Sequence, residues 1–296
     1  MNRSKSLVAA LIVVLVLLGA GSWLMFGKTL GLSYANADQY TAGDTEITSA
    51  VEHLDINWTS GKVVIEYHSG SGVSVRETAN KTLSDDDKLH WWLDGTTLRV
   101  QYAKPGIRYF WNNWNLQKTL TVSLPEGTVL KSAKIDATAA DLEIGSLAAD
   151  EILLDTTAGD IIASTATKKL VVTSTSGKMD IRQDSALDSA KLSATAGSIS
   201  CRLADAKEID ADTTAGSINM TVTGSAKNIR LDSTAGSVTL RLPTEPGFTC
   251  RVSTTAGSFS SPLSLQKDGK TYTCGDGSVQ CSISTTAGSV RLDKAE

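Results

Sequence analysis

Residues that could carry catalytic chemistry are few and scattered in this chain of 296 residues. All three histidines, His53, His68 and His90, lie before residue 91. The sequence has no Gly-x-Ser-x-Gly elbow, no phosphate-binding loop and no Cys/His cluster with zinc-ligand spacing. Nucleophilic, phosphoryl and metal chemistry depend on such arrangements, so we expect no enzyme, no metal site and no cofactor.

Carboxylates are the next candidates for chemistry. Two pairs of aspartates recur at a spacing of 19 or 20 residues, namely Asp136 with Asp155 and Asp212 with Asp232. Such groups could serve a calcium site or the acid pair of a glycosidase. The equivalent positions between the two pairs hold Thr173 and Ser193, so neither pair gathers the several oxygen ligands that calcium takes. We interpret these aspartates as a solvent-facing column.

Cysteine chemistry is limited to four residues. Cys250 and Cys281 occupy the same inward position in neighbouring repeats, where a strand spacing of about 4.8 Å permits a disulfide. Cys274 lies on an insertion between them and could pair with either one, so the pairing among the three stays open. Cys201 has no cysteine at an adjacent repeat position, and we expect it to be a buried thiol.

One segment is rich in aromatic residues without a regular period. Lys104 to Asn115 carries Pro-Gly and Asn-Asn pairs, which mark it as a loop. Its aromatic residues are the candidate ligand-binding or partner-binding residues Tyr109, Phe110, Trp111 and Trp114. They either fold back as a lid over the open end of the domain or form an exposed platform for a cell-surface protein, a glycan or a lipid.

The elements that must position these residues form a short repeat whose signature is Thr-Ala-Gly-Ser. A degenerate copy at Ala140 leads the series, and successive copies lie 19, 18, 20, 19, 20 and 21 residues apart. The last step is 31 residues, so about ten residues are inserted there. One further copy lies far upstream. The repeat glycines are Gly61, Gly159, Gly177, Gly197, Gly216, Gly236, Gly257 and Gly288.

Apolar residues alternate with polar ones on both sides of each glycine, which predicts two β-strands joined at a tight corner. Glycine suits that corner because it accepts a positive φ without steric cost. One unit cannot bury its apolar face alone, but units stacked in parallel bury a continuous core. Units of about 19 residues are too short for separate sandwiches or propeller blades. The sequence therefore predicts an all-β, right-handed, single-chain β-solenoid.

The N-terminus carries an export signal. Leu7 to Phe26 is a charge-free apolar run of 20 residues, long enough to cross the ~30 Å hydrocarbon core as a helix. Arg3 and Lys5 precede this run, which leaves the N-terminus cytoplasmic by the positive-inside rule. A signal peptide cleaved after Ala37 is the alternative, and both interpretations export the rest of the chain. We expect a single-pass protein of the cell membrane with its bulk outside the cytoplasm.

The expected organisation has four parts. Residues 1–30 form a cytoplasmic stub and transmembrane signal-anchor helix, and residues 31–45 form a linker. Residues 46–130 form an N-terminal rung and a cap region with the aromatic loop. Residues 131–296 form the repeat solenoid, with a hairpin inserted at 261–277. The net charge of -4 argues against a nucleic-acid partner, which would need a basic surface.

The repeated T-x-x-G-[DS]-[IV] rungs, with Gly275-Asp276-Gly277 and the final copy at Ser284–Leu292, resemble the bacterial "putative adhesin" (toast-rack-like) β-solenoid family of cell-envelope proteins. The resemblance covers about residues 45–293 and implies a fold and a compartment but no catalytic residues. This chain departs from the family in preferring Ala-Gly-Ser to the commoner Asn-Gly-Asp corner.

These observations predict a non-enzymatic, extracytoplasmic domain that is anchored to the bacterial membrane. It would act as an adhesin-like binding protein or as a sensor of envelope stress. The alternatives are a structural envelope spacer without a specific ligand and an enzyme acting on cell-wall glycan.

Overall fold

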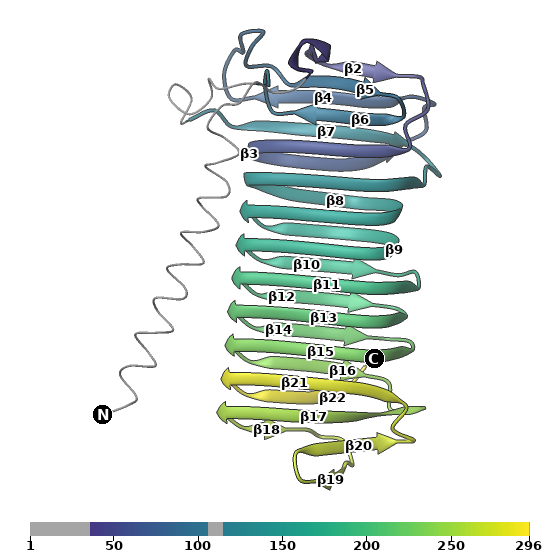
Figure 1. The fold of residues 1–296 in the computed structure, drawn as a ribbon, viewed down its shortest axis with the longest axis vertical. Coiled ribbons are helices and arrows are strands. Elements are labelled where there is room, and N and C mark those ends of the chain that lie inside the picture. Colours follow the sequence, from purple (N-terminus) through teal and green to yellow (C-terminus); the bar gives the residue numbers. More distant parts are fainter. Residues whose placement is uncertain (1–35, 106–114, 296) are drawn as a thin grey trace, which may run out of the picture.

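The computed structural model describes residues 36–105 and 115–295, and this part of the chain is almost entirely β-structure wound into an elongated solenoid (Figure 1). One short 3-10 helix, Ala37–Gln39, precedes the strands. In the described ranges, no helix has the length and apolar character needed to cross a membrane. The apolar run from Leu7 to Phe26 lies outside these ranges, as do Tyr109, Phe110, Trp111 and Trp114.

The strands fall into three groups along the chain. Those of the N-terminal region are β1 (Thr41–Ala42), β2 (Thr45–Ile47), β3 (His53–His68), β4 (Val73–Ala79), β5 (His90–Asp94), β6 (Thr97–Gln101) and β7 (Lys118–Pro125). Those of the central stack are β8 (Leu130–Ala158), β9 (Ile161–Ser176), β10 (Met179–Gln183), β11 (Leu187–Ala196), β12 (Ile199–Leu203), β13 (Ala206–Ala215), β14 (Ile218–Val222), β15 (Ala226–Ala235) and β16 (Val238–Leu242). Those of the C-terminal region are β17 (Gly247–Ala256), β18 (Phe259–Ser260), β19 (Gln266–Asp268), β20 (Thr271–Gly275), β21 (Val279–Ala287) and β22 (Val290–Lys294).

Each rung of the central stack consists of a long strand, a glycine corner and a short strand. The long strands pair in parallel and in register, as in β11 with β13 and β13 with β15. The short strands do the same, as in β12 with β14. We call the outward side of the sheet of long strands the broad face. The predicted β-solenoid is therefore confirmed, with its alternating burial pattern on both sides of every corner.

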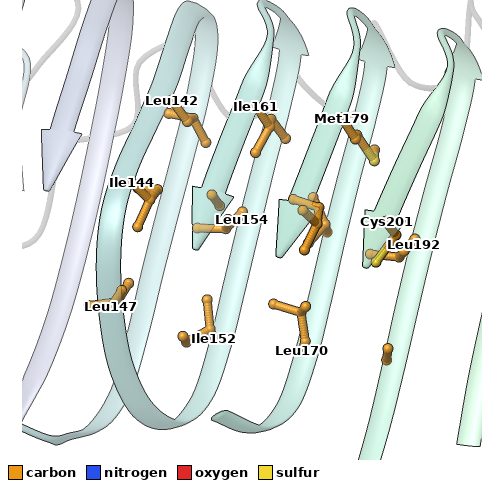
Figure 2. Packing of buried hydrophobic residues seen from close by; sticks show 14 of the residues in the cluster. Leu142, Ile144, Leu147, Ile152, Leu154, Ile161, Leu170, Met179, Leu192 and Cys201 are labelled. Atoms are coloured by element: carbon orange, nitrogen blue, oxygen red, sulfur yellow. The ribbon is translucent and has the colours of Figure 1, made fainter. Parts of the chain in front are cut away.

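The core lies between the two sheets. Equivalent inward side chains stack from rung to rung, as Figure 2 shows for Leu142, Ile161 and Met179. All three are at most 1% exposed. Burying one such side chain contributes about 1.5–3 kcal/mol, and the stack repeats this gain at every rung.

The stacking order at the C-terminal end differs from the chain order. β21 pairs with β15 on one side and with β17 on the other, and β22 lies in the same way between β16 and β18. The last rung in the sequence is therefore the second to last in space, as Figure 1 shows. The four-residue connection from Pro243 to Pro246 carries the chain past the inserted rung.

A similar insertion occurs at the N-terminal end. β3 pairs with β8 on one side and with β6 and β7 on the other. It therefore lies between strands β7 and β8, which are consecutive in the chain. Antiparallel strands cover the outermost rungs: β5 pairs with β6, β4 with β7, and β20 with β17. β19 and β20 form the predicted hairpin around Asp268 and Gly269. These strands pair backbone groups that would otherwise form open sheet edges.

The glycine corners are required mainly by the contact between rungs. An ideal Cβ on Gly216 would lie 1.9 Å from the carbonyl oxygen of Gly197, and the other repeat glycines of the stack show overlaps of the same size. The expected positive φ is clear at Gly61, with 102°. Gly216 has no φ in the left-handed region, so conformational freedom is not its reason. The expected positive φ also occurs at Gly159 and Gly177, so the predicted reason holds at some corners, whereas close contact between rungs is the reason at Gly216.

The rest of the signature makes hydrogen bonds between rungs. The buried hydroxyl of Thr213 donates to the carbonyl oxygen of Gly197 (3.1 Å), and Thr285 bonds to Gly236 in the same way (3.0 Å). The residue after the glycine offers a side-chain oxygen to the next rung, since the amide of Ser217 donates to Oγ of Ser198 (3.4 Å). Thr, Gly and Ser thus form one inter-rung contact unit.

Candidate binding face

A shallow groove runs along the broad face, parallel to the axis of the stack. It has a volume of about 650 Å³ and crosses β9, β11, β13, β15 and β21. Five rungs at a strand spacing of about 4.8 Å give it a length of roughly 20 Å. The main chain around Leu170, Ala190, Ile209, Ile229 and Cys281 forms its floor.

Strand register builds the two walls of this groove. Alternate side chains of a strand point to the same side, so in-register parallel strands align equivalent residues in columns. One wall consists of Lys169, Ser189, Glu208, Asn228 and Gln280. The other consists of Val171, Lys191, Asp210, Arg230 and Ser282. The inserted rung supplies Gln280 and Ser282, so the fifth rung of the groove carries these two residues because β21 lies next to β15.

Some of the charged side chains in the groove form ion pairs with other residues of the chain. Lys169 pairs with Glu151 (2.6 Å) and Arg230 with Asp232 (2.6 Å), both near the surface. The Asp232 carboxylate raises the pKa of Arg230. The side chains of Lys191 and Glu208 form no ion pair or hydrogen bond within the part of the chain that the structure describes. Both are exposed and lie on adjacent strands, on opposite walls and two register positions apart, so the groove offers both a cation and an anion.

The predicted aspartate column lies on the broad face beside the groove. Asp155 is half-buried, and burial is the main cause of its raised pKa, followed by repulsion from Asp136. Asp212 pairs in register with Asp232 and accepts a hydrogen bond from Ser193 (2.8 Å). The described residues include no group of three or more His, Cys, Asp or Glu side chains placed to hold a metal ion.

The structure brings two of the three candidate disulfide cysteines together. Cys250 and Cys281 are register partners on β17 and β21. Cys274 on β20 is half-buried and lies opposite Phe248 instead. Cys201 is buried, as expected, and its burial raises the pKa of its thiol.

Sequence reasoning missed a buried ion pair in the N-terminal cap. The Lys118 ammonium is fully buried, lies 2.6 Å from a carboxylate oxygen of Glu77, and donates to the carbonyl oxygen of Asp87 (2.8 Å). It also donates to the carbonyl oxygen of Tyr102 and lies 5.0 Å from the ring centre of Trp58. Burial lowers the pKa of Lys118.

The position of Lys118 in its strand carried the signal for this ion pair. The residue shares the inward side of β7 with Leu120 and Val122, so a lysine there needs a buried partner. Its contact with Tyr102, the residue after β6, joins the end of β6 to the start of β7. The aromatic segment lies between these two strands in the sequence. A smaller hollow of about 370 Å³ lies beside it, next to Gly61 and Asn80.

The fold and its corner motif define a class of toast-rack β-solenoids. The family model described as Toastrack DUF4097 matches residues 51–293, and this chain belongs to that family. The comparison with curated proteins gives no match.

Three solved bacterial structures are among those similar to this chain. A "putative adhesin" from Bacteroides fragilis is 13% identical, with 86% of this chain and 96% of that one covered at a TM-score of 0.50. A "putative adhesin" from Parabacteroides distasonis is 14% identical, with 85% and 96% covered at a TM-score of 0.48. A "putative cell adhesion protein" from Clostridium sporogenes is 11% identical, with 86% and 99% covered at a TM-score of 0.31.

Proposed function

We propose that this protein is a non-enzymatic, adhesin-like binding protein of the bacterial envelope, which holds a polysaccharide strand along the groove of its broad face. The groove itself supports this proposal most directly, because each of its two walls is a column of equivalent side-chain positions from five successive rungs. The apolar run from Leu7 to Phe26 supports display from the membrane as a single-pass protein. The name of the Bacteroides fragilis structure accords with a role in adhesion.

The chemistry of the groove favours a polysaccharide over a peptide or a lipid. An extended peptide binds by adding a strand to an open sheet edge, whereas the backbone groups under the groove are already paired between β9, β11, β13, β15 and β21. A lipid surface would need an apolar patch, and within residues 36–105 and 115–295 the exposed large apolar side chains, Val129 and Ile162, lie outside the groove. Hydroxyl, amide, ammonium and carboxylate groups line the walls, which fits a hydroxylated polymer with charged substituents.

The test is binding of the purified chain to bacterial cell-wall polysaccharide, measured by titration at low and high salt. Replacing Lys191, Glu208 and Asp210 together with alanine should weaken binding at least ~10-fold, since charge-assisted hydrogen bonds would be lost. The matched control is the Lys207→Ala, Asp188→Ala double variant. It removes an exposed ion pair of 2.6 Å on the same two strands but outside the groove.

Other outcomes assign other functions. If the groove variant binds as well as the parent, the proposed site is wrong. Replacing Phe110, Trp111 and Trp114 with serine then tests the aromatic platform. Concentration-dependent assembly without polysaccharide binding would favour a structural spacer. Release of shortened glycan would show an enzyme.

A further inference from the structure

The inserted C-terminal rung has a competing arrangement. β21 lies between β15 and β17, although β17 is made earlier in the chain. All three strands carry the same alternation and end in the same Thr-Ala-Gly-Ser corner. As a result, β15 and β17 could also pair directly with each other, and β21 would then lie on the outer side of β17. Strands with equivalent patterns specify their neighbour weakly. β21 is next to β17 in both arrangements, so this contact is the constant one at the C-terminal end of the stack.

Two thiols lie at this contact between β17 and β21. Cys250 and Cys281 face each other across the β17–β21 pair, both on the core side, with exposures of 0% and 6%. Adjacent in-register positions on parallel strands place their Cα atoms about 5 Å apart, within the range that disulfides bridge. The residue opposite Cys250 on its other side is Tyr272, while Cys274 is displaced by two residues, to a position opposite Phe248. The geometry selects one of the pairings that the sequence leaves open.

We propose that Cys250 and Cys281 form a disulfide bond that staples β21 to β17 at the C-terminal end of the stack. The proposal requires the oxidising compartment that export would supply, but it does not depend on the ligand of the groove. Cys281 contributes to the groove floor, and its neighbours Gln280 and Ser282 end the two walls. The staple would therefore also hold the last pair of groove side chains in place.

The reaction balances with an external disulfide as oxidant. The two thiols lose two protons and two electrons and form one S–S bond. A small disulfide such as oxidised glutathione, or the active-site disulfide of a thiol oxidoreductase, takes up the electrons and becomes two thiols. The thiolate is the reacting form, and contact with Cys250 together with burial raises the pKa of the Cys281 thiol. The bond should therefore form before β21 is fully packed and only slowly in the folded, reduced protein.

The experiment uses the full chain, reduced and unfolded and then refolded with oxidised glutathione. After alkylation without reductant, peptide mapping should find Cys250 linked to Cys281, with Cys201 and Cys274 alkylated. The folded, reduced chain should acquire the link at least ~10-fold more slowly. Four alkylated cysteines, or a link that includes Cys274, would overturn the proposal.

Two variants separate a staple from simple core packing. Cys274→Ser should keep the link, with the oxidised mass still lower by two hydrogens. Cys281→Ser should melt roughly 5–10 °C below the oxidised parent. In excess reductant this difference from the parent should vanish. A difference that persists unchanged in reductant would show that Cys281 acts only by packing, which contradicts the proposal.

Discussion

The two bends of each rung follow different rules. At each glycine corner from Gly159 to Gly288, two residues separate the strands, such as Gly197-Ser198 between β11 and β12. At the opposite bend, the connection has three residues between β10 and β11, two between β12 and β13, and four between β16 and β17. The corner is uniform because main chains of neighbouring rungs touch there. The opposite bend opens to solvent, where length and composition can vary.

The largest expected effect comes from filling the corner. Gly216→Ala would place a Cβ 1.9 Å from the carbonyl oxygen of Gly197, and two stacked backbones cannot both give way without loss of pairing. We expect a loss of at least about 2 kcal/mol in the free energy of unfolding. The control is Gly145→Ala, at the register irregularity of β8 between Ile144 and Leu147, where the nearest atom would be 3.5 Å away. Equal shifts in the urea midpoint for the two variants would show that close contact between rungs is not what requires glycine at position 216.

The sequence predicted most of the central stack, because period-two alternation around a fixed glycine has one efficient way to bury its apolar side. It could not predict the insertion of β21. The residues Ile229, Cys250 and Cys281 are equivalent apolar partners, so no local pattern tells β15 which of the two following strands it pairs with. The order depends on connections and end caps, which act over long range.

The groove was not among the binding sites predicted from the sequence. The outward columns follow from the repeat, but the groove between them depends on side-chain sizes and on the neighbour of β15, neither of which the pattern specifies. Its fifth rung would carry Thr249 and Arg251 if β17 had followed β15, instead of Gln280 and Ser282. The aromatic segment lies outside the described residues, so its role stays a prediction.

An intermediate effect should come from the hydroxyl that precedes the corner. Thr213→Val keeps the shape of the side chain but removes the donor to the carbonyl oxygen of Gly197. We expect a loss of about 1 kcal/mol in the free energy of unfolding, measured by urea denaturation. The adjacent Thr214 is exposed, and Thr214→Val should lie within about 0.5 kcal/mol of the parent. If the two variants are equally stable, the hydroxyl ladder does not hold the corners together.

The smallest expected effect concerns the broad face, away from either bend. Asp155 has a pKa above its ordinary value of 3.8, first because of burial and then because of Asp136. A carboxyl with a raised folded-state pKa binds its proton more tightly in the folded state, so its ionisation costs stability as the pH rises through that pKa. Asp155→Asn should therefore stabilise the protein at pH 7, and solvent screening keeps the gain below about 1 kcal/mol. Below pH 3.8 the parent carboxyl is protonated in both states, and the gain should disappear.

Asp232→Asn is the matched control for this prediction. The Asp232 carboxylate pairs with Arg230 at 2.6 Å, so its removal should bring no gain in stability at pH 7. The melting temperatures of the parent and the two variants, recorded between pH 3 and pH 8, measure these differences in stability. A gain for Asp155→Asn that does not change with pH would show that ionisation of Asp155 is not its cause.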